Sequence, residues 1–131
     1  EFSTIAENSK CKFLSLQKGY GEEQLKDCLF KNKFVDFQKE VNEIWDFVET
    51  SSIIANCDLI ITSDSAVAHL AAGMGKKTWL LLQKIPDWRW GLKGSHSFWY
   101  ENMEIFRQVE INNWQEVMIR VSIRLNNFLN N

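Results

Sequence analysis

The sequence has little proline and no long hydrophobic run. It contains one proline and six glycines in 131 residues, which excludes collagen-like and low-complexity architectures. The nearest approach to a membrane span is the apolar run 79–82, far below the roughly 18–20 residues that a spanning helix needs. No positively charged segment followed by an apolar one stands at the N-terminus, so we expect no signal peptide.

Charge of one sign and paired cysteines are also lacking. Fifteen basic and 17 acidic residues give a net charge of −2, which provides no general attraction to nucleic acid or acidic membranes. The three cysteines, Cys11, Cys28 and Cys57, form an odd set without a CxxC motif, so neither a disulfide framework nor a zinc site is expected. This pattern favours a reducing, cytoplasmic location. Because the chain begins with Glu1 rather than Met, we expect it to be a piece of a larger protein.

The composition, 45% apolar and 24% charged, is that of an ordinary globular protein, and residues 1–131 fit a single domain. Short apolar runs alternate with helical patterns. Two runs, 59–62 and 78–82, are continuously apolar, as in strands that are covered on both faces. We therefore expect a parallel, three-layer α/β sheet of about four to six strands, with these two adjacent at its centre. The expected strands are 12–16, 34–37, 59–62, 78–82 and 104–107, and the expected helices are 22–30, 46–56, 66–75 and 113–129.

Local signals mark several helix ends. Asp46 followed by Glu49 resembles a capping box, with Trp45 as the apolar residue before the cap. Asn113 followed by Glu116 predicts the start of a final helix with one apolar stripe. A glycine of C-cap type closes the helix of small residues at 66–75.

The most informative segment is the junction 61–69, where a buried strand passes into a helix. Ligands of open parallel sheets bind at the carboxyl ends of strands, and Asp64, Ser65 and Ala66 would leave helix-start amides open to an anion. His69 lies one turn into the helix and could face the same ligand. The alternative is that Asp64 or Ser65 only caps the helix and His69 is a packed histidine.

The aromatic loop 86–90 is a second candidate site. Arg89 stands between two tryptophans, and a guanidinium stacked on indoles would suit a phosphate or a sugar. The alternative is an aromatic cluster that holds a long loop over the sheet.

A third candidate follows the first expected strand. Lys18 beside two glycines could meet a phosphate, and Glu22 or Glu23 could take a ribose diol. A lone Gly-x-Gly is a weak signal, and a turn followed by a helix start explains the same residues.

Taken in order, these stretches resemble the C-terminal, nucleotide-sugar-binding half of the heptosyltransferase-like glycosyltransferases of family 9, which have a GT-B fold. The branch that follows tetratricopeptide repeats in longer bacterial proteins is the most similar. The matching stretches run from Phe13 to the final helix, and they comprise 13–19, 46–50, 58–71, 79–82, 86–90, 99–100 and 105–108.

The resemblance implies roles for the candidate residues. Asp64, Ser65 and Ala66 with His69 look like the element that holds the diphosphate and sugar of the donor. Trp45 would lie against the nucleobase. Glu22 or Glu23 would bind the ribose. Lys18 and Arg89 are candidates for the basic side chain that, with helix-terminus amides, offsets charge on the leaving nucleoside diphosphate. No metal and no cofactor besides the donor sugar nucleotide is implied, and no catalytic residue can be assigned.

Two parts of the family's pattern are missing. The first strand of the C-terminal domain and the whole N-terminal domain, with the acceptor contacts and catalytic base, do not appear in this chain. We therefore expect a Rossmann-like half of a GT-B fold that binds donor without transferring hexose or heptose alone. An open sheet edge beside 59–62 would favour self-association. The alternative is a non-catalytic α/β interaction module that uses its aromatic loop for protein contacts. A phosphohydrolase is disfavoured, because Asp64 has no second carboxylate nearby in the sequence.

Overall fold

The computed structural model describes residues 2–7 and 10–131. The chain divides into two compact units, one of Glu1–Thr50 with Met118–Asn131 and the other of Ser51–Val117. The two boundaries fall inside helices α4 (Phe47–Ala55) and α6 (Trp114–Leu129). Each unit is described by itself.

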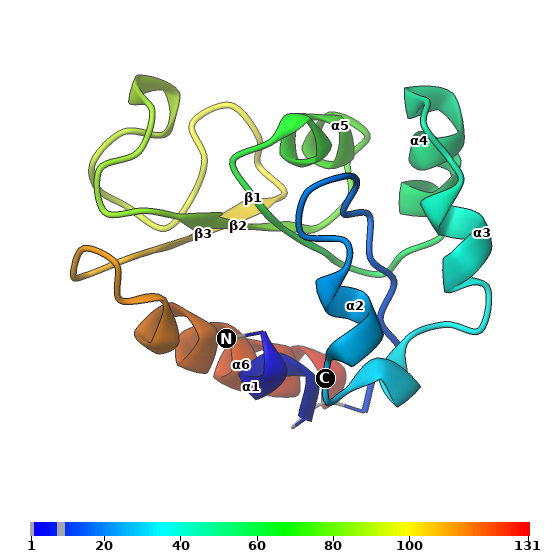
Figure 1. The fold of residues 1–131 in the computed structure, drawn as a ribbon. Helices are drawn as coiled ribbons and strands as arrows, with labels where there is room; N and C mark the ends of the chain where they lie inside the picture. Colours follow the sequence, from blue (N-terminus) through cyan, green and yellow to red (C-terminus); the bar gives the residue numbers. More distant parts are fainter. Residues whose placement is uncertain (1, 8–9) are drawn as a thin grey trace. The chain divides into compact units, whose positions relative to one another are not determined.

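The second unit contains a parallel sheet of three strands (Figure 1). β1 (Ile60–Ser63), β2 (Thr78–Leu82) and β3 (Met103–Arg107) lie in the order β1-β2-β3. Ile60 is opposite Thr78, which is opposite Met103. The predicted Rossmann-like α/β arrangement and the pairing of the two apolar strands are confirmed. The predicted strand number is wrong, because this sheet has three strands, and β1 lies at its edge rather than at its centre.

The core of this unit forms around the central strand. All five residues of β2 are buried, which explains its continuously apolar sequence. On one face, side chains of β2 and β3 pack with the small residues of α5 (Ala66–Gly73). On the other face, the rings of Trp79 and Phe106 lie 5.4 Å apart. The buried cluster on the α5 face comprises Ala68, Ala72, Leu80, Leu82, Trp90, Met103 and Ile105.

Helix α5 ends in a Schellman motif, in agreement with the C-cap glycine that the sequence predicts. Gly75 has a φ of +78°, and its N–H donates to the Ala72 carbonyl, while the Lys76 N–H donates to Ala71. The Asn102 side chain then donates to the carbonyls of both Ala72 and Lys76. Since the Asn102 carbonyl also accepts from the Thr78 N–H at 3.0 Å, one residue ties the end of α5 to the starts of β2 and β3.

Both predicted N-caps are confirmed. Asp46 Oδ1 accepts from the Glu49 N–H at 2.7 Å, and Asn113 Oδ1 accepts from the Glu116 N–H at 3.3 Å. In α6 most of the predicted apolar stripe is buried, but Leu129 is exposed. The buried members are Val117, Met118, Val121 and Leu125.

In the first unit, the predicted strands 12–16 and 34–37 are wrong. They meet in a single parallel bridge between Phe13 and Phe34. Beyond it, the Gln38 side chain takes the place of a neighbouring strand: its Oε1 accepts from the Ser15 N–H and its Nε2 donates to the Ser15 carbonyl, both at 2.8 Å. Gln38 opens helix α3 (Gln38–Asn42), so the chain turns helical before a ladder can extend.

The predicted helix 22–30 is shorter than expected. α2 covers only Gln24–Asp27, and Cys28 is extended, with φ −72° and ψ 141°. A short 3-10 helix η1 (Lys31–Lys33) follows. Leu29, which a helix over 22–30 would place on one face with Leu25 and Cys28, is 88% exposed. Because the helix ends at Asp27, this shared apolar face does not form.

A further helix, α1 (Ser3–Glu7), has no predicted counterpart. It buries Ile5 and Ala6 completely, and its Thr4 carbonyl accepts from the Ser122 hydroxyl of α6 at 3.2 Å. Over the described residues, no helix is both long and apolar enough to cross a membrane.

Candidate functional site

The junction between β1 and α5 is open at the start of the helix. Ser65 is the N-cap residue and has an extended backbone, with φ −152° and ψ 169°. Its hydroxyl lies 3.1 Å from that of Thr62, and no side chain of the described residues caps α5. Ser65 therefore occupies the N-cap position, as the alternative expected, but its hydroxyl does not bond to a helix amide. Ala66 is exposed and small, so no bulky side chain covers the first turn of α5. The Ala68 N–H already donates to the Ser65 carbonyl at 3.0 Å, which leaves the N–H groups of Ala66 and Val67 for an anion.

A pocket of about 320 Å³ adjoins this junction at the carboxyl ends of β1 and β2. Ser63, Asp64 and Gln83 supply polar groups, and the indole of Trp114 supplies an aromatic surface. Asp64 and Gln83 are exposed, so their polar groups are hydrated before a ligand arrives. The remaining lining residues are Leu81, Leu82 and Pro86. A carboxylate, an amide, a hydroxyl and an indole around one cavity can bind a polar ring that also has an apolar face.

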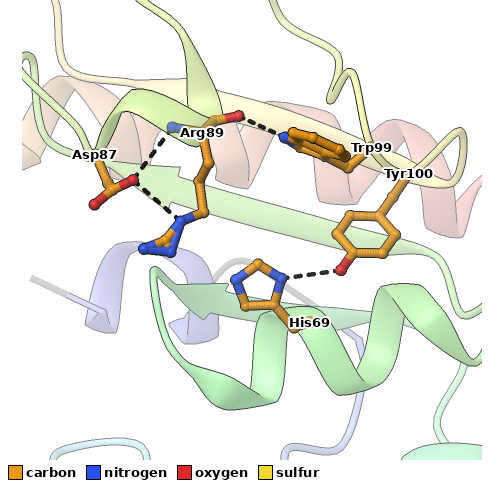
Figure 2. A network of polar contacts seen from close by, with 5 residues as sticks. All are labelled: His69, Asp87, Arg89, Trp99 and Tyr100. Atoms are coloured by element: carbon orange, nitrogen blue, oxygen red, sulfur yellow. Dashed lines mark hydrogen bonds and ion pairs between the residues drawn. The ribbon is translucent and has the colours of Figure 1, made fainter.

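His69 lies in an aromatic cluster. Its imidazole stacks on the indole of Trp90, with ring centroids 5.2 Å apart and 24° between the planes. Its Nδ1 is 2.9 Å from the hydroxyl of Tyr100, and Figure 2 shows the two side chains pointing toward each other. His69 is half-buried, so the packed-histidine alternative is correct about its ring contacts and leaves its second nitrogen, Nε2, for a ligand.

The aromatic loop contains the 3-10 helix η2 (Trp88–Trp90). Asp87 caps it by accepting from the Arg89 N–H at 3.2 Å, and the same oxygen accepts from Arg89 Nε at 3.1 Å (Figure 2). The guanidinium therefore bonds to a carboxylate, where the sequence suggested that it lies between two indoles. Trp90 is 4% exposed and Trp88 is 79% exposed, so one indole belongs to the core and the other faces outward.

Several hydrogen bonds hold the long loop 83–102 at both ends. Near its start, Gln108 Oε1 accepts from the Lys84 N–H at 3.3 Å. Trp99 Nε1 donates to the Arg89 carbonyl at 2.9 Å, and Arg107 Nη2 donates to the Trp90 carbonyl at 3.1 Å. Burial lowers the pKa of Arg107 from its ordinary value, because a cation loses hydration there. These hydrogen bonds tie the loop to Arg107 and Gln108, and its buried Trp90 packs with Ala68 and Ala72 of α5.

The four other predicted donor-binding residues belong to the first unit. Lys18 Nζ donates to the Val41 carbonyl, and Glu23 Oε2 accepts from the Gly21 N–H at 3.1 Å. Glu22 is half-buried, and Trp45 is 73% exposed. Position N4 of α4 is the polar Thr50, so Trp45 has no apolar staple partner there.

Of the predicted residues, Asp64 lines the pocket and Ser65 and Ala66 begin α5 next to it, whereas His69 contacts Trp90 and Tyr100 and is not among the lining residues. The structure also adds residues that the sequence analysis missed. Trp114 was assigned to an apolar stripe, yet it lines the pocket with Ser63 and Gln83. Tyr100 was noted only as part of a matching stretch. Tyr100 precedes β3, which begins at Met103, and no sequence pattern connected it to α5.

No group of three or more His, Cys, Asp or Glu side chains in the described part of the chain could hold a metal ion. All three cysteines are free thiols.

Comparison with known proteins identifies the family. The family model of glycosyltransferase family 9 (heptosyltransferase) matches residues 17–116. Searches of curated proteins and of solved structures gave no significant match. The matched region covers the β1–α5 junction, the pocket and the aromatic cluster. The chain therefore belongs to glycosyltransferase family 9.

Proposed function

We propose that this chain binds the nucleoside-diphosphate sugar donor of a glycosyl transfer, at the carboxyl ends of β1 and β2. The observation that supports this most is the start of α5, where the N-cap hydroxyl bonds to Thr62 instead of the helix and Ala66 leaves the amides accessible. Backbone N–H groups and the helix dipole together attract phosphate, typically by about 0.3–2 kcal/mol from the dipole alone.

The adjoining pocket suits the sugar of the same donor. A pyranose ring has an apolar face that could lie on the indole of Trp114, and its hydroxyls could bond to Asp64 and Gln83. A diphosphate at Ala66 would place the attached sugar at this end of the sheet. Arg89, Lys18, Glu22, Glu23 and Trp45 remain candidate contacts to the phosphates, ribose and base.

In the transfer step, the glycosidic bond to the leaving nucleoside diphosphate breaks as an acceptor hydroxyl attacks the anomeric carbon. Negative charge develops on the leaving phosphate, and the amides of α5 with the His69 Nε2 would stabilise it there. The acceptor contacts and catalytic base would come from a GT-B N-terminal domain, so we expect donor binding without transfer by this chain alone. Self-association through the β1 edge and a cytoplasmic location are parts of the same proposal.

The test is calorimetric titration of the chain with nucleoside diphosphates, comparing Ala66→Val with the parent. The valine methyls would occupy the approach to the amides, so affinity should fall at least about tenfold, or about 1.4 kcal/mol. Ala55→Val, another exposed alanine on a helix, is the matched control for the modest cost of valine in a helix. Equal affinities for parent, Ala66→Val and Ala55→Val would contradict the proposed site.

The alternative is an interaction module that uses the aromatic loop. It is favoured by one observation: Trp88, Phe98 and Trp99 are 79%, 95% and 57% exposed on the same loop. Exposed aromatic side chains are typical of protein interfaces. The absence of any nucleoside-diphosphate binding, with a binding partner lost on Trp88→Ala, would favour this alternative over donor binding.

A further inference from the structure

The contacts around His69 leave it one ring nitrogen for a ligand. The indole of Trp90 stacks on the imidazole at 5.2 Å, and the ring of Tyr100 meets the imidazole edge-on at 5.9 Å and 62°. Nδ1 is engaged by the Tyr100 hydroxyl at 2.9 Å. Nε2 has no hydrogen-bond partner among the described residues, and it is the only other polar atom of the side chain.

Tyr100 is itself held by the turn that precedes β3. Its N–H donates to Ser97 Oγ at 3.2 Å, and its carbonyl accepts from the Met103 N–H at 3.2 Å. Two residues later, Asn102 bonds to the carbonyls at the end of α5. The hydroxyl is therefore presented to His69 by a turn that is attached to the same helix as His69.

The chemistry of the two groups decides which nitrogen of His69 bears a proton. A phenol O–H is a better donor than acceptor and a neutral imidazole nitrogen is a good acceptor, so the favoured arrangement has the Tyr100 hydroxyl donating to Nδ1 and the proton of the neutral ring on Nε2. When the ring is cationic, Nδ1–H donates to the phenol oxygen instead, because a hydroxyl can both donate and accept. Nε2 is an N–H donor in both states.

We propose that Tyr100 is a positioning residue, which fixes His69 as the Nε2–H tautomer so that it donates to a phosphate oxygen of the donor whether or not the ring is charged. This inference rests on the proposed function for its ligand. The tautomer itself is a property of the unliganded chain, and it can be measured separately. Stacking on Trp90 sets the orientation of the imidazole plane, and the hydrogen bond from Tyr100 determines which nitrogen bears the proton.

The first experiment reads the tautomer directly. Long-range ¹H–¹⁵N correlation spectra of the two histidines, at a pH where both are neutral, should show His69 as the Nε2–H form. In Tyr100→Phe, which retains the ring and loses the hydroxyl, His69 should become a mixture of tautomers. His96, which is exposed and lies beside Ser95 Oγ at 3.2 Å, should not change. Tyr20→Phe removes the hydroxyl of the other tyrosine, which is 94% exposed, and is the matched control.

The second experiment tests whether Tyr100 acts through His69. Tyr100→Phe should weaken binding of a nucleoside diphosphate about two- to tenfold. The double variant Tyr100→Phe with His69→Ala should bind no more weakly than His69→Ala alone, because the hydroxyl then has no ring to orient. Additive losses would overturn the positioning role.

The two readouts separate the two proposals. An Nδ1–H tautomer in the parent, or an unchanged tautomer in Tyr100→Phe, overturns the inference about Tyr100 whatever the chain binds. If Tyr100→Phe changes the tautomer of His69 but the parent binds no nucleoside diphosphate, the inference about Tyr100 holds and the proposed ligand is wrong. The parent spectrum alone decides the tautomer if Tyr100→Phe does not fold.

Discussion

Asp46 accepts a hydrogen bond from the backbone N–H of Glu49 across 2.7 Å, and this contact begins helix α4. Asp46→Ala should lower the free energy of unfolding by about 0.5–2 kcal/mol, the usual cost of losing an N-cap. Urea unfolding followed by circular dichroism measures it. Asp36→Ala, at an exposed aspartate outside any helix, should change stability by less than about 0.5 kcal/mol. Equal losses in both variants would mean that the cap contributes nothing of its own.

Two glycines at the end of α5 should respond in opposite directions to alanine. Gly73 is helical and exposed, and a Cβ there would meet no atom within 4 Å, so Gly73→Ala should stabilise the chain by about 0.4–1 kcal/mol. Gly75 also has open space but a φ of +78°, so Gly75→Ala should destabilise it by about 1 kcal/mol or more. Thermal melting of the pair checks the difference. A stabilised Gly75→Ala would contradict the Schellman geometry.

His69 has both a packing and a binding contribution, and two substitutions separate them. His69→Ala should weaken nucleoside-diphosphate binding by about 1–3 kcal/mol and also cost about 0.5–1.5 kcal/mol of stability through the lost stacking on Trp90. His69→Phe should keep most of the stacking and lose the binding. Calorimetric titration and thermal melting of both variants provide the comparison. Unchanged affinity in His69→Phe would remove the imidazole from the donor site.

The two tryptophans of η2 should differ strongly. Trp90 is part of the core, so Trp90→Ala should cost about 3–5 kcal/mol, whereas the exposed Trp88→Ala should stay within about 0.5 kcal/mol. Chemical unfolding measures both. Comparable losses would show that Trp88 is also packed in solution.

Cys57 makes stability depend on pH. Burial raises the pKa of its thiol, an effect reinforced by Asp58 and partly offset by Lys76. The folded chain therefore keeps this proton to a higher pH than the unfolded chain does. The stabilisation is complete below the unfolded pKa, about 8.5, and it is lost as pH rises through the folded value. The unfolding free energy should decline more steeply above about pH 8.5 in the parent than in Cys57→Ala. If the unfolding free energies of the parent and of Cys57→Ala change with pH in the same way, the raised pKa of Cys57 is contradicted.

Sequence patterns predicted the second unit far better than the first. In β2 the apolar run is buried along its whole length, and at Gly75 the backbone requires a left-handed residue, so local chemistry and final structure agree. Around Ser15, by contrast, a strand-like sequence pairs with the Gln38 side chain, a partner 23 residues away that no periodicity reveals. Leu29 is another example, because apolar residues on one face of a helix are buried only if another element covers that face.

The candidate site likewise contains residues that the sequence could reveal and residues that it could not. Ser65 and Ala66 could be found from the sequence because a strand and a helix meet there in consecutive residues. Tyr100 and Trp114 could not, since each reaches the site from a distant part of the chain. The aromatic cluster depends on Trp90 and Tyr100 meeting His69 from a loop whose path only the folded structure gives.

Asn102 links helix α5 to the last two strands by hydrogen bonds. Its side chain donates to the carbonyls of Ala72 and Lys76, and its own carbonyl accepts from the Thr78 N–H. Because breaking any one element exposes the partners of the others, these three elements should open together in native-state hydrogen exchange. Their amides would then report one common opening free energy. The proposed anion site would thus lie on a single cooperative foldon, whose rigidity depends on one asparagine side chain outside the site.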